Sequence, residues 1–226
     1  MDGRPDCATA LLNLGESRER PTTIVWDFGG VLFRWDPAAL IARTLPHRLS
    51  DDHGAQHWKH QFFARPDGEW VAFDRGTLGV DDVVTGIALR LAWPQAEVRA
   101  VVDAVPDELQ PIDGSVRLLR TLQQRGHRLH FLSNMPAPLA EHLQRQHAFL
   151  GLFASGIYSS QVQLVKPEPA IYARAQQLLG LDPAATLFID DHPDNIEAAQ
   201  HHGWQARLFT GPEALAVELR ELELID

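Results

Sequence analysis

The apolar residues of the chain fall into short runs separated by longer amphipathic stretches. Runs of about five residues that are rich in β-branched and aromatic side chains are typical of buried parallel strands. The run at 22–28 is the first of these, and its members are almost all apolar or β-branched. Four further runs predict strands at 129–133, near 156–159, at 186–190 and at 205–209.

The segment from about 35 to 107 has no strand pattern and is predicted to be entirely helical. Apolar residues three and four positions apart, with proline or capping residues at the ends, predict four short helices. These helices are expected at 37–45, 50–63, 81–92 and 95–105, the last one ended by Pro106. Four short helices after the first strand predict a small helical bundle inserted as a cap.

From residue 111 onward, helical and strand patterns alternate. Helices are predicted at 113–125, 139–150, 168–179, 194–202 and 212–222. Such alternation is typical of a parallel sheet with crossover helices. We therefore predict an α/β fold with a Rossmann-like three-layer parallel sheet core, formed by residues 22–34 and 108–226, and a helical cap at 35–107. Residues 1–21 are predicted to be a disordered leader, without the pattern of a secretory signal.

Composition narrows the class of partner. The chain has 226 residues and a formal net charge of -10, with no cluster of lysine and arginine. Proteins that bind nucleic acid or anionic membranes rely on such clusters, so neither partner is expected. Cys7 is the single cysteine, which excludes an internal disulfide and fits a reducing cytoplasm. The sequence leaves the oligomeric state open.

Polar side chains stand where the predicted strands end. Ligands of open parallel sheets collect outside the carboxyl ends of the strands, so these residues are expected to share one crevice. Glycines next to the first strand end would let backbone N–H groups approach a bound anion. The residues concerned are Asp27 with Gly29 and Gly30, Ser133 with Asn134, Asp190 with Asp191, and Lys166 at a helix start.

The charges of these residues indicate the chemistry. Asp27, Asp190 and Asp191 would bring about three negative charges together, which would raise one another's pKa values unless compensated. A hard divalent cation and Lys166 would compensate them, and Mg²⁺ suits carboxylate oxygens and bridges to phosphate. Ser133 and backbone N–H groups would then help bind a phosphate. Asp27 is placed to attack phosphorus and form an aspartyl-phosphate.

Four motifs in this order resemble the signatures of the haloacid dehalogenase superfamily of aspartate-nucleophile hydrolases. They are Trp26–Leu32, Phe131–Asn134, Val165–Pro169 and Phe188–Glu197. The resemblance implies that Asp27 is the nucleophile and a metal ligand, that Gly29 gives a carbonyl to Mg²⁺, and that at least one of Asp190 and Asp191 binds the metal. It implies phosphate binding by Ser133 and Asn134, and a lysine, Lys166, that steadies the nucleophile and the transferring group. Among superfamily members, the chain is most similar to bacterial sugar-phosphatase-like proteins, including alpha-glucose-1-phosphate phosphatases, whose substrates are small phosphorylated molecules.

One position departs from the family pattern. Most phosphatases of the family carry a second aspartate two residues after the nucleophile as general acid and base, and here that residue is Gly29. A positioned acid contributes typically 10²–10⁴-fold in rate. We therefore expect either a substrate with a good leaving group, such as an anomeric sugar phosphate, or a replacement acid. His192 and Asp36 are the candidates.

Two other functions stay open at this point. A metal-independent haloacid dehalogenase would use Asp27 to attack carbon, and it would tolerate Gly29. A catalytically weak phosphate-ligand binding or regulatory protein would keep the fold without efficient catalysis.

Two further patterns have simpler explanations. His53, His57 and His60 share a helix face, and we interpret them as an exposed polar face rather than a metal site. The tryptophans in and near the cap are expected to pack its bundle, although one or two of them could line the substrate pocket. These are Trp35, Trp58, Trp70 and Trp93.

Overall fold

The computed structural model describes residues 21–49 and 53–226. The predicted leader therefore lies, apart from Pro21, outside the described residues. The predicted helix start at Ser50 also lies outside them.

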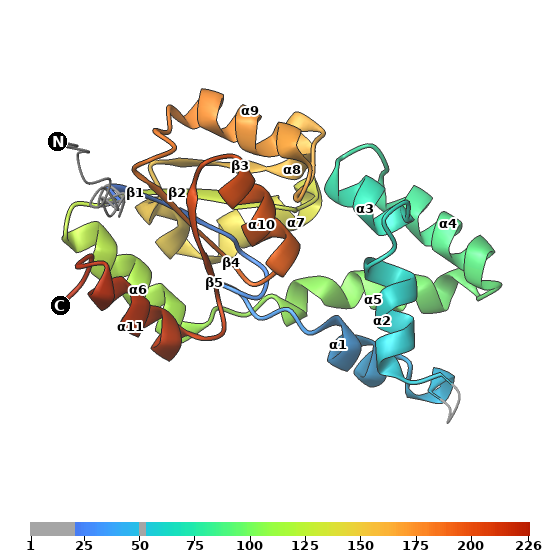
Figure 1. Ribbon diagram of the computed structural model, residues 1–226. Helices are drawn as coiled ribbons and strands as arrows, with labels where there is room; N and C mark the ends of the chain where they lie inside the picture. Colours follow the sequence, from blue (N-terminus) through green and yellow to red (C-terminus); the bar gives the residue numbers. More distant parts are fainter. Residues whose placement is uncertain (1–20, 50–52) are drawn as a thin grey trace, which may run out of the picture.

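A parallel sheet of five strands forms the centre of the core (Figure 1). Its strands are β1 (Thr23–Trp26), β2 (Arg128–Ser133), β3 (Ser155–Tyr158), β4 (Thr186–Asp190) and β5 (Gln205–Leu208). Their order across the sheet is β3-β2-β1-β4-β5, and every pairing is parallel. The first strand along the chain is thus the central one, with β2 on one side and β4 on the other.

Helices cover both faces of the sheet. They are α6 (Asp113–Gln124), α7 (Ala137–Gln146), α9 (Pro169–Leu179), α10 (Pro193–His201) and α11 (Pro212–Glu221). Successive strand residues point to opposite faces, so Val25 and Phe188 belong to the apolar cluster beneath α9 and α10. Ile24 and Leu187 belong to the cluster that includes apolar residues of α6, α7 and α11. This arrangement confirms the predicted α/β fold with three layers.

In the described parts of the chain, five α-helices and a short 3₁₀ turn lie between β1 and α6 (Figure 1). We call those of residues 37–49 and 53–108 the cap helices. Their bounds are α1 (Pro37–Thr44), η1 (Pro46–Arg48), α2 (Ala55–Phe63), α3 (Glu69–Asp74), α4 (Val80–Leu91) and α5 (Gln95–Glu108). Aromatic side chains pack at their centre, where the rings of Trp58 and Trp93 lie 4.5 Å apart and Trp70 packs edge-on against Phe63. Trp35 packs against both Phe63 and Trp70.

The cap helices differ from the predicted ones in two places. Helix α3 was not predicted, because six residues are too few to give a helical repeat. Helix α5 continues past Pro106 to Glu108, whereas we predicted that the proline would end it. A proline in the last turn removes few helical hydrogen bonds, and the Glu108 carboxylate holds the helix end in place by accepting hydrogen bonds from Arg43 and from the Asp36 N–H.

The core contains two short elements that the sequence pattern did not separate. The predicted helix at 139–150 is divided into α7 and a 3₁₀ helix, η2 (Ala148–Leu152), because His147 has an extended backbone. A one-turn helix, α8 (Ser159–Val162), follows β3 directly. Its first residue, Ser159, is completely buried.

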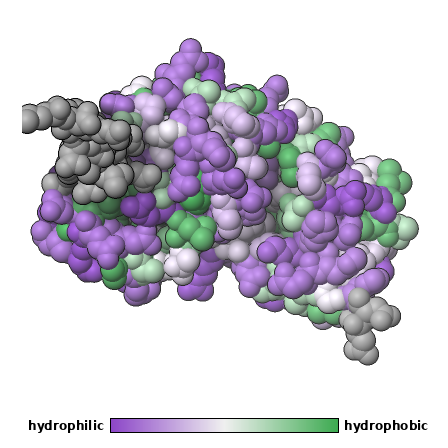
Figure 2. All heavy atoms as spheres, viewed as in Figure 1, coloured by the Kyte–Doolittle hydropathy of each residue, from purple (hydrophilic) through white to green (hydrophobic). Residues whose placement is uncertain are grey.

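In the part of the chain that the structure describes, no helix is both long and apolar enough to cross a membrane. Figure 2 shows one face of the molecule, on which polar residues predominate and apolar ones form only small patches.

Candidate functional site

The carboxyl ends of the three central strands bring polar side chains together. Asp27 follows β1 directly, and its side chain is almost completely buried. Ser133 and Asp190 are the last residues of β2 and β4, and both are buried. The pairings of Trp26 with Phe131 and Ile189 keep the three strand ends level. The structure thus places these three residues at one edge of the sheet, as the sequence predicts.

Lys166 links two of the carboxylates. Its Nζ atom lies 2.8 Å from Oδ1 of Asp27 and 2.6 Å from Oδ2 of Asp190. Burial alone would lower the pKa of Lys166, but the two aspartates outweigh this effect and raise the pKa. The buried ammonium therefore stays charged and holds the Asp27 side chain in one orientation.

Asp190 is held by several donors at once. Oδ2 accepts from Lys166, while Oδ1 accepts from the His192 N–H at 2.8 Å and from Nδ2 of Asn195 at 2.9 Å. A buried carboxylate that accepts several hydrogen bonds is rigid and well oriented. Asp190 therefore holds the Lys166 ammonium in the position where it contacts Asp27.

The Asp191 carboxylate lies close to those of Asp27 and Asp190, but Asp191 is exposed to solvent. It lies against Gly30, whose φ of +77° is in the left-handed region that favours glycine. A Cβ atom at position 30 would lie 2.1 Å from Oδ2 of Asp191. Glycine at this position is therefore required for the Asp191 carboxylate to come close to the loop after β1.

The negative charge of this cluster is only partly compensated. Burial is the main factor that raises the pKa of Asp27, and the charges of Asp190 and Asp191 raise it further. Lys166 opposes the shift, yet the pKa still reaches about 7. A carboxyl group with this pKa is half protonated near neutral pH, so one further cation nearby would favour its ionised form.

The three carboxylates fit a divalent cation. Asp27, Asp190 and Asp191 each offer an oxygen, and these oxygens lie within 4.8 Å of one another. Among the described residues this is the single group of acidic, histidine or cysteine side chains with such spacing. An all-oxygen set of this kind suits Mg²⁺. The helix-face histidines are not in such a group, and the rings of His53 and His57 are stacked with centroids 4.4 Å apart.

Two residues predicted to bind phosphate already have other partners. The Nδ2 atom of Asn134 donates to the Lys166 carbonyl at 3.0 Å, and its Oδ1 accepts from the Lys166 N–H at 2.8 Å. The Gly30 N–H donates to the Phe33 carbonyl at 2.8 Å. The Asn134 side chain thus positions the backbone of Lys166, and the Gly30 N–H stabilises the turn after β1.

Gly29 differs from Gly30 in what surrounds it. Its φ lies outside the left-handed region, and a Cβ atom there would make ordinary contacts, the nearest at 3.6 Å from Cβ of Trp35. Neither the backbone nor local packing therefore requires glycine at position 29.

The two residues considered as replacement acids have other surroundings. Asp36 caps helix α1 by accepting from the Ala39 N–H at 3.0 Å, and it is exposed. The His192 side chain is 62% exposed and lies 3.9 Å from Asp194. Among the described residues, no hydrogen bond or ion pair joins either side chain to Asp27 or Lys166.

A residue that sequence reasoning missed lies close to the cluster. Asp74 is the last residue of α3, and its side chain is partly buried. Burial raises its pKa to about 8, the charge of Asp27 adds to the rise, and Lys166 opposes it. Asp74 is therefore within electrostatic reach of both residues. A lone aspartate in a short unpredicted helix gave no signal in the sequence.

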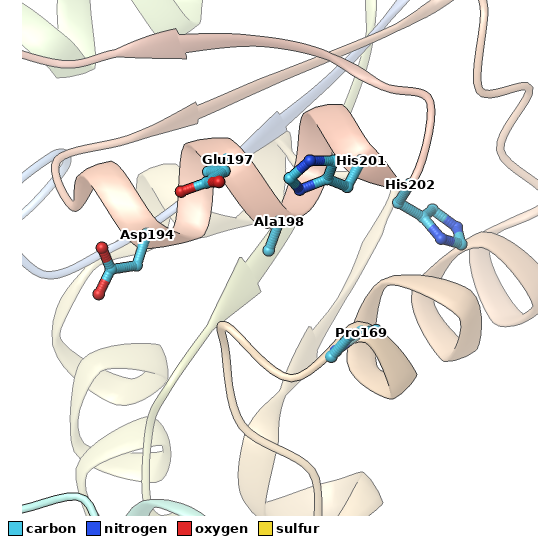
Figure 3. Close-up of a pocket in the computed structure, with 6 residues that line it drawn as sticks. All are labelled: Pro169, Asp194, Glu197, Ala198, His201 and His202. Carbon is cyan, nitrogen blue, oxygen red and sulfur yellow. The ribbon is translucent and has the colours of Figure 1, made fainter.

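Two cavities of about 260 Å³ each lie elsewhere on the molecule. Figure 3 shows the first, which is lined by Pro169 of α9 and by residues of α10, where Ala198 points toward Pro169. The second lies where α3 and α5 meet α7, and its lining includes Trp70, Phe73 and Leu139. Neither cavity includes Asp27, Lys166 or Asp190.

The chain is similar to known proteins in sequence and in fold. The chain is 28% identical to a sesquiterpene phosphatase of Aspergillus oryzae, over 88% of this chain and 94% of that protein. A solved structure of a haloacid dehalogenase family enzyme from Bacteroides thetaiotaomicron, in complex with magnesium and inorganic phosphate, superposes with a TM-score of 0.65 at 21% identity. That superposition covers 83% of this chain and 93% of the other. An L-2-haloacid dehalogenase from Xanthobacter autotrophicus has the same fold, with a TM-score of 0.63, 21% identity and coverage of 88% and 82%.

Residues 21–203 match the family of haloacid dehalogenase-like hydrolases. The match includes all four motifs identified in the sequence and the entire cap. The chain therefore belongs to the haloacid dehalogenase-like hydrolase family and is a hydrolase.

Proposed function

We propose that the protein is a Mg²⁺-dependent phosphatase that hydrolyses a small phosphorylated molecule through an aspartyl-phosphate on Asp27. This proposal rests on one observation. Carboxylate oxygens of Asp27, Asp190 and Asp191 lie within 4.8 Å of one another, and Lys166 compensates only part of their charge by contacting Asp27 and Asp190. Such an excess of negative charge would repel a phosphate unless a divalent cation were bound.

Each residue has a proposed part in the reaction. One carboxylate oxygen of Asp27 attacks phosphorus, while Lys166 fixes the side chain and offers positive charge to the phosphoryl oxygens. The buried hydroxyl of Ser133 donates to the phosphate. Asn134 keeps Lys166 in position through the two hydrogen bonds to its backbone.

Asp27, Asp190, Asp191 and the carbonyl of Gly29 are the proposed ligands of Mg²⁺. When bound, the ion would neutralise charge on the phosphate and on the carboxylates during transfer. Gly30 contributes by admitting the Asp191 carboxylate to this set. The Mg²⁺ and phosphate complex of the Bacteroides enzyme supports the choice of metal.

A metal-independent dehalogenase is the second candidate function. It is favoured by one observation, the absence of a carboxylate at position 29, together with the fold shared with the Xanthobacter dehalogenase. The uncompensated carboxylates weigh against it, because a reaction without metal gains nothing from the extra negative charge of Asp191. Metal removal separates the two functions, since a dehalogenase would keep its activity in EDTA.

The substrate class follows less directly from the site. The resemblance of the motifs to sugar phosphatases favours a sugar phosphate, whereas the Aspergillus relative is a sesquiterpene phosphatase. We propose a phosphate monoester whose organic group faces the cap helices. Sugar-1-phosphates, sugar-6-phosphates and terpenyl phosphates assayed together would discriminate among these substrates.

The test of the proposed function is turnover of p-nitrophenyl phosphate and of this panel with Mg²⁺. We expect activity that is lost in EDTA, restored by Mg²⁺ and abolished in Asp27→Asn. Absence of turnover with every phosphate ester would instead favour a phosphate-ligand binding or regulatory protein.

A further inference from the structure

The end of helix α3 is fixed against the catalytic edge of the core. The hydroxyl of Ser159, the first residue of α8, donates to the Asp74 carbonyl and accepts from the Met135 N–H at 2.8 Å. Met135 comes two residues after Ser133, at the end of β2. A buried serine thus ties the backbone of Asp74 to the strand end that carries the proposed phosphate-binding hydroxyl.

A second attachment lies one residue further along the chain. The Arg75 guanidinium forms a two-pronged ion pair with Glu168, in which Nη1 lies 2.9 Å from Oε2. Glu168 also accepts from the Val165 N–H at 3.3 Å, next to Lys166. Gly76 allows the chain after α3 to pack closely against α8, because a Cβ atom at position 76 would lie only 2.8 Å from the Ser160 carbonyl oxygen. The position of the Asp74 backbone is therefore set from both sides, by the end of β2 and by the loop that carries Lys166. Figure 1 shows α3 beside α8 at this point.

The Asp74 carboxyl group lies close enough to Asp27 and Lys166 to interact electrostatically with both. The charged groups that affect its pKa are Asp27, which raises it, and Lys166, which lowers it. Burial raises the same pKa further, to about 8. A carboxyl group that holds its proton at neutral pH can serve as a general acid, and it can take a proton back when ionised.

We propose that Asp74, presented by cap helix α3 and held by Ser159 and Arg75, is the general acid and base that replaces the carboxylate missing at position 29. This inference rests on the proposed phosphatase function. In the first step, a bond forms between an Asp27 oxygen and phosphorus as the bond to the leaving-group oxygen breaks, and Asp74 gives its proton to that oxygen. In the second step, Asp74 takes a proton from water as the water oxygen attacks phosphorus and the Asp27–phosphorus bond breaks.

The proposal predicts a dependence on the leaving group. The phenol oxygen of p-nitrophenyl phosphate departs without protonation, whereas the alcohol oxygen of glycerol phosphate needs a proton. We expect Asp74→Asn to retain most of the kcat/KM for p-nitrophenyl phosphate, which reports the first step alone, and to lose about 10²–10⁴-fold in kcat/KM for glycerol phosphate. The kcat should fall for both substrates, because the second step is common to them. Asp67→Asn is the matched control, because it removes an exposed carboxylate of the cap segment; both activities should stay at the wild-type level.

The comparison of the two substrates separates the possible outcomes. Equal activity of Asp74→Asn and wild type on glycerol phosphate would overturn the proposal while leaving the phosphatase function intact. Equal loss of kcat/KM on both substrates, with an unchanged melting temperature, would also overturn it, because a positioning role does not depend on the leaving group. Asp74→Ser provides a second variant, for which the same selective loss is expected. Failure of the wild type on every phosphate ester would overturn the phosphatase function itself.

Discussion

Gly30 and the Asp191 carboxylate lie so close together that position 30 has no room for a side chain: a Cβ atom there would lie 2.1 Å from Oδ2 of Asp191. The contact joins the loop after β1 to the end of β4. It brings the exposed third carboxylate toward Asp27.

This contact predicts opposite outcomes for two adjacent glycines. Gly30→Ala has to accommodate a left-handed φ, which costs about 1–2 kcal/mol, and it has to displace the Asp191 carboxylate. We expect lower stability and weaker activation by Mg²⁺, measured as a higher Mg²⁺ concentration at half-maximal activity. Gly29→Ala is the matched control and should keep both properties within about 0.5 kcal/mol. Equal behaviour of the two variants would contradict the assigned role of Gly30.

Replacing Lys166 should affect both stability and activity. Lys166→Met leaves Asp27 and Asp190 buried without their shared cation, and breaking such a pair costs about 3–5 kcal/mol. We expect a clear fall in the free energy of unfolding, measured by urea denaturation, and loss of phosphatase activity. The chain has one other lysine, Lys59 on α2, so Lys59→Met tests the loss of a lysine outside the site. A stable and active Lys166→Met variant would refute the arrangement described here.

Asn134 is expected to act through Lys166. Asn134→Ala removes both hydrogen bonds to the Lys166 backbone and leaves that N–H and carbonyl without these partners, at a cost of about 1–3 kcal/mol each if they stay buried. We expect a lower melting temperature, and a lower kcat that is similar for aryl and alkyl phosphates. A selective rise in KM for phosphate esters, with stability unchanged, would instead indicate direct phosphate binding by the amide.

The contribution of Asp27 and Asp74 to the stability of the metal-free protein should fall as the pH rises. Asp27 and Asp74 have pKa values of about 7 and about 8 in the folded protein, against an ordinary value of 3.8. Between these limits the folded chain holds protons that the unfolded chain has released, so their contribution to stability is complete below about pH 4 and is lost by about pH 8. Melting temperatures in EDTA at pH 5 and pH 8.5 measure the effect.

Two controls accompany the melting experiment. Mg²⁺ should raise the melting temperature more at pH 8.5 than at pH 5, because protons compete for the same carboxylates. Asp74→Asn carries no titrating group at this position, so the melting temperature of this variant minus that of the wild type should increase with pH. Each kcal/mol corresponds to about 2–4 °C in a chain of this size. A difference in melting temperature between Asp74→Asn and the wild type that shrinks as the pH rises would contradict the raised pKa of Asp74.

The sequence predicts the core of this protein well because each strand is a separate apolar run. Once β1 and β4 are placed in a parallel sheet, Asp27 and Asp190 have to lie at the same edge. Lys166 could be added to the group because its motif resembles that of a known family. The bounds of these strands differ from the predicted ones by no more than two residues.

The parts that could not be predicted depend on contacts between distant positions. Asp74 reaches the site because its carbonyl accepts from Ser159, 85 positions away, and because Arg75 pairs with Glu168, 93 positions away. A six-residue helix has no periodicity that would indicate such contacts. Similarly, the sequence cannot show whether the amide of Asn134 faces a phosphate or the backbone of Lys166.

The central claim is that Asp27 becomes phosphorylated, and trapping that intermediate tests it most directly. The wild-type protein, mixed with p-nitrophenyl phosphate and Mg²⁺ and quenched in acid within milliseconds, is digested and analysed by mass spectrometry. We predict one added phosphoryl group on the peptide that contains Asp27, absent in Asp27→Asn and in EDTA. Turnover that persists in EDTA, or that proceeds without label on this peptide, would contradict the account.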